Sequence, residues 1–463
     1  MGERELIGIA GLGALFVLLA LRAPVGLAMI GVGIGGNYVL SLYVPFLRFE
    51  PYLKQFKTLL WSNMANYDLS VVPLFVLMGY LASQSRLSAD LFKGLEAVMA
   101  RFRGGVAMAA VGACGGFGAV CGSSLATAAT MGQVALPELS RLKYSPRLAT
   151  GALAAGGTLG ILIPPSVALV IYAIIVEASI LKMFQAAVIP GLLAVAGFIA
   201  TIWLLLKIKP ELAPDPEPMP PAEKRQALKR LAPVVLIFGG IILGLGFGLF
   251  TPTPAASVGV FAILAYGFAL RYFTGSGLSG SGLQEAIKST AKTSGMIYLI
   301  LFGAEVLKGF FARAGLPAAI AEWAGASPLD PWAILILMLV LLILLGCFME
   351  SLAMIVVVVP FFWPILVTLN GGDFASADTA TFGLSADDLK IWFGILALIV
   401  VELGLITPPV GLNVYVISAL SKDATMVETF KGVIPFLGAE VVRVGLILLI
   451  PSIALTIPHW LTS

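Results

Sequence analysis

Leu159–Gly160–Ile161–Leu162–Ile163–Pro164–Pro165 and Leu403–Gly404–Leu405–Ile406–Thr407–Pro408–Pro409 are two similar stretches from opposite halves of the chain. Each places a glycine and a proline pair inside an apolar run. Proline removes a backbone donor and clashes with the preceding turn, so both runs are expected to be broken helices. Free backbone groups at membrane depth must face protein, water or a bound ion, and matched breaks in two halves indicate the binding centre of a transporter.

The composition indicates a polytopic membrane protein. The 463 residues are 59% hydrophobic and 11% charged, against roughly 25% charged residues in a soluble domain. Apolar runs long enough to span a bilayer recur along the whole chain, and we expect eleven or twelve spans plus two re-entrant hairpins. Glu3, Arg4 and Glu5 precede the first run, which is therefore predicted to be a retained span and not a cleaved leader.

A stretch rich in proline and basic residues separates two halves of the chain. Residues 207–230 contain six lysines and arginines and six prolines, which predicts a solvated cytoplasmic linker by the positive-inside rule. The halves are then residues 1–206 and 231–463. The three cysteines lie in apolar surroundings and are expected to be packing residues. A single histidine, His459, excludes a histidine-rich zinc site and a histidine-based triad.

The two halves resemble each other beyond the proline pairs. Ser124–Leu125–Ala126 matches Ser351–Leu352–Ala353 at an offset of 227 positions. The shared order predicts an all-α fold of two repeats, each with spanning helices, a re-entrant hairpin and a Pro–Pro broken helix. We expect the repeats to be inverted, although this depends on an odd number of spans that periodicity does not settle. The expected hairpins are at about 112–140 and 340–367, and the expected broken helices at about 148–178 and 391–420.

A segment rich in glycine and hydroxyl residues, Gly112–Thr127, is expected at membrane depth in the first half. Glycine lets the backbone turn, and Ser and Thr supply oxygen ligands. Set against the break that contains Gly160, such a turn can surround a hard monovalent cation such as sodium with carbonyl and hydroxyl oxygens. The alternative is a face of small residues for helix packing.

The second half has different residues at the matching positions. Glu350 lies opposite Ser123 in the repeat, and an ionisable residue at that depth is a functional candidate, as sodium ligand, structural anchor or proton carrier. Thr407 adds a hydroxyl beside the second break. Asn413 adds an amide where half-helix N-termini suit a carboxylate substrate, although it could equally be an interhelical hydrogen-bond partner.

Other charges within apolar runs are first interpreted as pairs that neutralise each other or as interfacial residues, namely Glu177, Glu305, Lys308, Glu402, Glu440 and Arg443. Glu305 and Lys308 are three residues apart on an expected helix, so we predict a local ion pair between them.

Four of these motifs together resemble the large membrane subunit of TRAP (tripartite ATP-independent periplasmic) transporters. They are residues 122–127 at the first hairpin, 156–166 around the first proline pair, Phe348–Met349–Glu350, and 406–413 around the second proline pair. The resemblance covers nearly the whole chain, and the two Pro–Pro motifs together are its most specific part.

The resemblance implies a secondary transporter of the bacterial inner membrane that takes up carboxylates with sodium. It also implies a periplasmic substrate-binding protein, a small four-helix membrane subunit, and a transport domain that moves like an elevator against a scaffold. No partnership with nucleic acid is expected. Because no small subunit is fused to the chain, a separate small partner is predicted.

Two sodium sites follow from the resemblance, residue by residue. The first would use Cys121, Ser123, Gly160, Ile163 and Pro165, and the second Glu350, Gly404, Thr407 and Pro409. Cys121 stands where the family can have a serine, so a backbone contribution is expected there. The candidate substrate-binding residues are Ser124, Thr127, Thr158, Ser351 and Asn413.

An enzyme is not expected, because the sequence has no convincing nucleophile–base pair, metal cluster or P-loop. The stronger alternative is a stand-alone ion-coupled anion carrier or sodium–proton antiporter with the same repeats.

Overall fold

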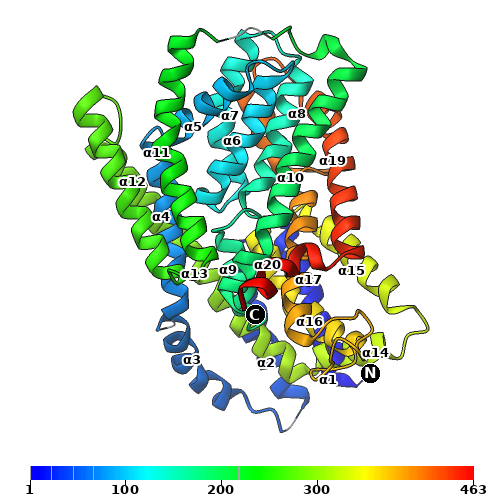
Figure 1. Ribbon diagram of the computed structural model, residues 1–463. Helices are drawn as coiled ribbons and strands as arrows, with labels where there is room; N and C mark the ends of the chain where they lie inside the picture. The colour runs from blue at the N-terminus through cyan, green and yellow to red at the C-terminus, as the bar shows by residue number, and fades with distance from the viewer. Residues whose placement is uncertain (1, 22, 45, 66, 217–218, 463) are drawn as a thin grey trace. The chain divides into compact units, whose positions relative to one another are not determined.

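The computed structural model describes residues 2–21, 23–44, 46–65, 67–216 and 219–462, and every regular element in those ranges is a helix (Figure 1). Seven of the described helices are long and apolar enough to cross a membrane, or eight if the bent pair Tyr67–Gln84 and Leu87–Met99 is one span. The all-α polytopic class is therefore confirmed. The count is lower than the eleven or twelve expected spans because long apolar runs are divided into shorter helices that flank breaks.

The first of two compact units consists of Met1–Ser70, Ala291–Met338 and Leu352–Lys390. Its helices are α1 (Glu3–Ala20), α2 (Val25–Tyr43), α3 (Phe49–Met64), the 3-10 helix η1 (Tyr67–Ser70), α14 (Leu316–Gly325) and parts of α13 (Gly280–Ala314), α15 (Pro331–Gly346), α16 (Ser351–Asn370) and α17 (Ala386–Gly404). Glycines let α1 and α2 approach α13, since a Cβ at Gly11 or Gly36 would lie 2.4 Å from the ring of Phe310. Small residues at helix contacts are typical of membrane bundles.

The second unit consists of Val71–Thr290, Leu339–Ser351 and Ile391–Ser463. Besides most of α17, the start of α13 and the end of α15, its helices are α4 (Val71–Gln84), α5 (Leu87–Met99), α6 (Gly105–Cys121), α7 (Ser124–Arg141), α8 (Pro146–Gly157), η2 (Thr158–Gly160), α9 (Val167–Ile175), α10 (Ile180–Ile208), η3 (Pro210–Leu212), α11 (Pro221–Gly246), α12 (Pro252–Thr274), α18 (Leu412–Leu420), α19 (Met426–Leu449) and α20 (Ser452–Thr462). Helix α8 packs against α6, α7 and α19 (Figure 1).

The first hairpin is formed by α6 and α7, which meet at Gly122 and Ser123. Gly122 adopts the left-handed region with φ +60°, which a glycine reaches without strain. The first broken helix follows: α8 and η2 end at Gly160, residues 161–166 are not helical, and α9 begins at Val167.

The second half has the same order of elements. Helices α15 and α16 are joined by residues 347–350, and the second broken helix consists of α17, the non-helical residues 405–411 and α18. The Pro164–Pro165 and Pro408–Pro409 bonds are both cis. The expected hairpins and Pro–Pro broken helices are therefore confirmed, whereas the inverted relation between the halves stays a prediction.

The stretch between the halves is shorter than the expected linker 207–230. Helix α10 runs through Ile208 and α11 begins at Pro221, so residues 209–220 connect them, and 217–218 lie outside the described residues. Proline is favoured in the first turn of a helix because its missing N–H has no partner to lose there. The compact units do not coincide with the halves 1–206 and 231–463, and that division stays a prediction about the sequence repeat.

Candidate functional site

The tip of the first hairpin packs directly on the first break. A Cβ at Gly118 would lie 2.6 Å from the Cα of Gly160. A Cβ at Gly160 would lie 2.8 Å from the carbonyl oxygen of Ser123 and 2.7 Å from Oγ1 of Thr127. Because both glycines lack a side chain, carbonyl and hydroxyl oxygens of the hairpin reach the broken backbone.

Three buried oxygens around this break have no hydrogen-bond partner in the described part of the chain: Oγ1 of Thr127, Oγ of Ser166 and Oδ1 of Asn413. All three residues are 0% exposed. A Cβ at Gly122 would lie 3.7 Å from the Cα of Ser166, which places that serine beside the hairpin tip. A buried polar atom without a partner costs about 1–3 kcal/mol. Three of them at one break favour a site that a ligand completes.

Asn413 belongs to the second broken helix and reaches the first. Its backbone N–H donates to the carbonyl of Leu405 at 3.0 Å, across the second break. Its side-chain Nδ2 donates to the carbonyl of Ala154 in α8 at 3.4 Å, and a Cβ at Gly157 would lie 3.0 Å from that Nδ2. The two breaks are therefore neighbours within the second unit.

The tip of the second hairpin packs on the second break. A Cβ at Gly404 would lie 2.7 Å from the backbone of Gly346, and Sγ of Cys347 donates to the carbonyl of Pro408 at 3.4 Å. The Thr407 hydroxyl donates to the carbonyl of Leu403 at 2.6 Å, which leaves its oxygen free to accept or to ligate. Glu350 is half-buried and makes no hydrogen bond or ion pair with the described residues.

Glu402 joins the two hairpins. One carboxylate oxygen accepts from the Ser124 hydroxyl at 2.5 Å and the other from the Ser351 hydroxyl at 2.7 Å. Glu402 is 2% exposed. The interpretation of Glu402 as an ion-paired or interfacial residue is therefore wrong, because its hydrogen bonds come from the first residues of α7 and α16.

Among the other intramembrane charges, one ion pair forms and the predicted pair does not. Arg443 and Glu440 in α19 form a buried ion pair, and Arg443 also donates to the carbonyl of Pro190 at 3.3 Å. The predicted pair between Glu305 and Lys308 is wrong, since the described structure has no ion pair there. Lys308 is exposed, and ordering an exposed head group stabilises little.

The predicted substrate residues are all buried, at no more than 3% exposure: Ser124, Thr127, Thr158, Ser351 and Asn413. The hydroxyl proton of Thr158 is directed to the carbonyl of Ala155 at 2.6 Å, and those of Ser124 and Ser351 to Glu402. The five therefore lie together in the second unit with the sodium candidates, and their role stays a prediction.

Sequence reasoning missed two residues of this region. Ser166 directly follows the first proline pair, and a hydroxyl at that position was the available signal. Glu402 precedes Gly404 by two residues, and its partners lie 278 and 51 positions away in the chain. No local pattern could have found them.

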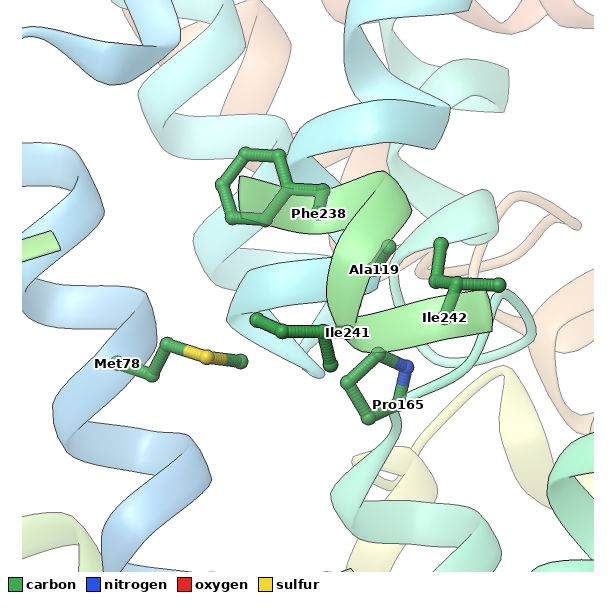
Figure 2. A pocket seen from close by; sticks show the side chains of 6 residues that line it. All are labelled: Met78, Ala119, Pro165, Phe238, Ile241 and Ile242. Carbon is green, nitrogen blue, oxygen red and sulfur yellow. The ribbon is translucent and has the colours of Figure 1, made fainter. Parts of the chain in front are cut away.

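A narrow apolar pocket lies next to the first break and is lined in part by α11. Pro165 shares it with Met78 of α4 and Ala119 of α6, and with Phe238, Ile241 and Ile242 of α11 (Figure 2). Since these side chains are all apolar, the polar groups of the site come from the hairpin tips and the broken backbone.

The family model described as "Tripartite ATP-independent periplasmic transporter, DctM component" matches residues 12–453. The chain belongs to the DctM family. It is 32% identical over 432 residues to the C4-dicarboxylate TRAP transporter large permease protein DctM of Pseudomonas aeruginosa, with 93% of this chain and 94% of that protein covered. It is 30% identical over 405 residues to the sialic acid TRAP transporter large permease protein SiaM of Vibrio cholerae, covering 86% and 88%.

The fold of this DctM-family chain is also similar to a solved structure. The crystal structure of the Alcanivorax borkumensis YdaH transporter, described as having an unusual topology, superposes with a TM-score of 0.60 at 15% identity, covering 86% of this chain and 88% of the other. At that identity the likeness concerns the fold alone. Family membership and the apolar helices together identify a multi-pass protein of the bacterial inner membrane and the large permease component of a TRAP transporter. The relatives named here are transport proteins and not enzymes.

Proposed function

We propose that this permease imports a small organic acid together with sodium, receiving the acid from a periplasmic binding protein and working with a separate small four-helix membrane subunit. Family membership supports the partners. The names of relatives support the cargo, since they give C4-dicarboxylate, sialic acid and isethionate. These compounds share a small anionic acid group, and a carboxylate is the commoner form among them.

The observation that carries the sodium proposal is the set of buried oxygens of Thr127, Ser166 and Asn413 at the first break, which have no hydrogen-bond partner among the described residues. Hard cations prefer carbonyl, hydroxyl and amide oxygens. The first sodium ion would be held by the Ser123 oxygens and by main-chain carbonyls, with the Thr127 hydroxyl adjacent. The main-chain carbonyls we assign to it are those of Cys121, Gly160, Ile163 and Pro165.

The second sodium ion would lie at the other break, where Glu350 contributes a carboxylate without a partner in the described chain. The Thr407 oxygen can ligate because its proton is already directed to a carbonyl. Backbone carbonyls of Gly404 and Pro409 complete the proposed set. One site would then be neutral and the other anionic, so the two ions are not equivalent.

The substrate would enter only when the hairpin tips move, because the candidate residues Thr127, Thr158 and Asn413 are buried at 3% exposure or less. Buried groups that must open to bind are consistent with an alternating-access cycle. Both hairpin tips and both breaks belong to the second compact unit. We assign the moving transport domain of an elevator mechanism to that unit.

The test is uptake into proteoliposomes that contain this permease and its small subunit. A radiolabelled dicarboxylate or sialic acid is presented on its binding protein, and a sodium or a proton gradient is imposed. We expect uptake to require both the sodium gradient and the binding protein. Ser123→Ala should raise the sodium concentration for half-maximal uptake about 10-fold if it removes one charge-assisted contact. Uptake driven by protons alone, without the binding protein, would support the stand-alone carrier or antiporter instead.

A further inference from the structure

Glu402 has a position that the proposed ion and substrate sites do not explain. It lies in the last turn of α17, is 2% exposed, and accepts hydrogen bonds from Ser124 and Ser351 through separate oxygens. The described residues include no lysine or arginine in an ion pair with it. Its carboxyl group is therefore held in place by the two serine hydroxyls.

The two serines are equivalent positions of the repeat, 227 residues apart. Ser124 is the first residue of α7 and Ser351 the first residue of α16, so each opens the helix that follows a hairpin tip. A helix N-terminus carries partial positive charge and stabilises a nearby carboxylate. Glu402 thus receives one donor and one helix end from each half.

Each serine is also next to a proposed sodium ligand. Ser124 follows Ser123, and Ser351 follows Glu350. Both hydrogen bonds to Glu402 are short, at 2.5 and 2.7 Å. Displacing one hairpin tip therefore also displaces the Glu402 carboxyl group, which is bonded to the other tip.

We propose that Glu402 is a positioning residue that clamps the two hairpin tips into one unit, so that a sodium ion bound at one site changes the sodium affinity of the other site. The clamp itself follows from the hydrogen bonds. The coupling between ions rests on the proposed sodium sites, and the two parts need separate measurements.

The clamp can be measured without sodium through native cysteines. Cys121 ends α6 at the first tip and Cys347 lies at the second tip, while Cys114 is 0% exposed within α6 and serves as an internal reference. In membranes suspended in choline chloride, labelling of each cysteine by a membrane-permeant maleimide is followed by mass spectrometry. Its rate reports transient opening of each tip.

We expect Glu402→Ala to raise the labelling rates of Cys121 and Cys347 about 10-fold, which corresponds to the loss of one buried hydrogen bond at each tip. Glu402→Gln should return both rates toward wild type, because the amide accepts from one serine and donates to the other. Ser351→Ala should raise the labelling rate of Cys121 as well as that of Cys347. The proposed clamp would be contradicted if each serine variant raised the labelling rate only of the cysteine in its own hairpin.

Sodium-dependent uptake measures the coupling. Glu402→Ala should raise the half-saturating sodium concentration about 10-fold and lower the Hill coefficient toward 1, with recovery in Glu402→Gln. Trp392→Phe is the matched control, because it removes a hydrogen bond of 2.8 Å to Ile447 from the same helix, and it should leave both values unchanged. If Glu402→Ala does not fold, the glutamine and serine variants decide.

The two possible failures are distinguishable. Wild-type uptake that does not depend on sodium refutes the proposed function, but the cysteine labelling rates still test the clamp. Unchanged labelling and unchanged sodium dependence in Ser124→Ala and Ser351→Ala, with sodium-driven wild-type uptake, refutes the positioning role of Glu402 alone.

Discussion

Gly160→Ala is the sharpest test of the first break as an ion site. The added methyl would lie 2.8 Å from the Ser123 carbonyl oxygen and 2.7 Å from the Thr127 hydroxyl, whereas ordinary contact begins at 3.4 Å. The Ser123 carbonyl must therefore move by about 0.6 Å, and overpacking of this kind costs about 1–3 kcal/mol. Because the displaced atoms belong to the proposed ligands, we expect roughly 10-fold weaker sodium binding at that site.

The assay is thermal stabilisation of the purified protein by sodium chloride relative to choline chloride. For sodium at about 100 times its dissociation constant, the stabilisation is about 2.7 kcal/mol, and tenfold weaker binding reduces it to about 1.4 kcal/mol. Gly197→Ala in α10 is the matched control, since a Cβ there meets nothing within 4 Å. It should keep the full sodium effect.

Two outcomes would contradict an ion site at the first break. The first is a Gly160→Ala protein whose sodium-dependent stabilisation equals that of wild type. The second is an equal loss in Gly197→Ala, which would attribute the effect to glycine replacement in general. A lower melting temperature in choline alone is expected for Gly160→Ala and does not bear on the ion site, because strain and ligand binding are measured separately.

Three further predictions concern the second break and the ion pair in α19. Glu350→Gln should raise the half-saturating sodium concentration about 10-fold at pH 8 if the carboxylate is a ligand, whereas loss confined to proton-driven uptake would make it a proton carrier. Thr407→Val should weaken sodium dependence by removing an oxygen, and an unchanged sodium titration would mean that the hydroxyl only closes the turn to Leu403. Arg443→Leu should destabilise the fold by about 3–5 kcal/mol, because it leaves the buried carboxylate of Glu440 unpaired; the double variant with Glu440→Leu should recover most of the melting temperature, and equal losses in both would contradict this.

The sequence alone was sufficient for the class of the protein and for the position of its breaks. Whether a helix can continue is decided by a few neighbouring residues, here a glycine and a proline pair within an apolar run. The breaks at 161–166 and 405–411 and both hairpins therefore follow from the chain itself. So does the match between the halves, because a repeat is a property of order along the chain.

Which polar groups meet depends on the folded chain. Ser124, Ser351 and Glu402 come from three helices, and Asn413 of one broken helix reaches Ala154 beside the other. Hydroxyl and amide groups have several rotamers and choose partners by distance in space, so separation along the chain carries no information about them. The expected linker also became partly helical, because Pro221 could start α11. The lack of a hydrogen-bond partner for the oxygens of Thr127, Ser166 and Asn413, within the described residues, likewise depends on which groups surround them in the folded chain.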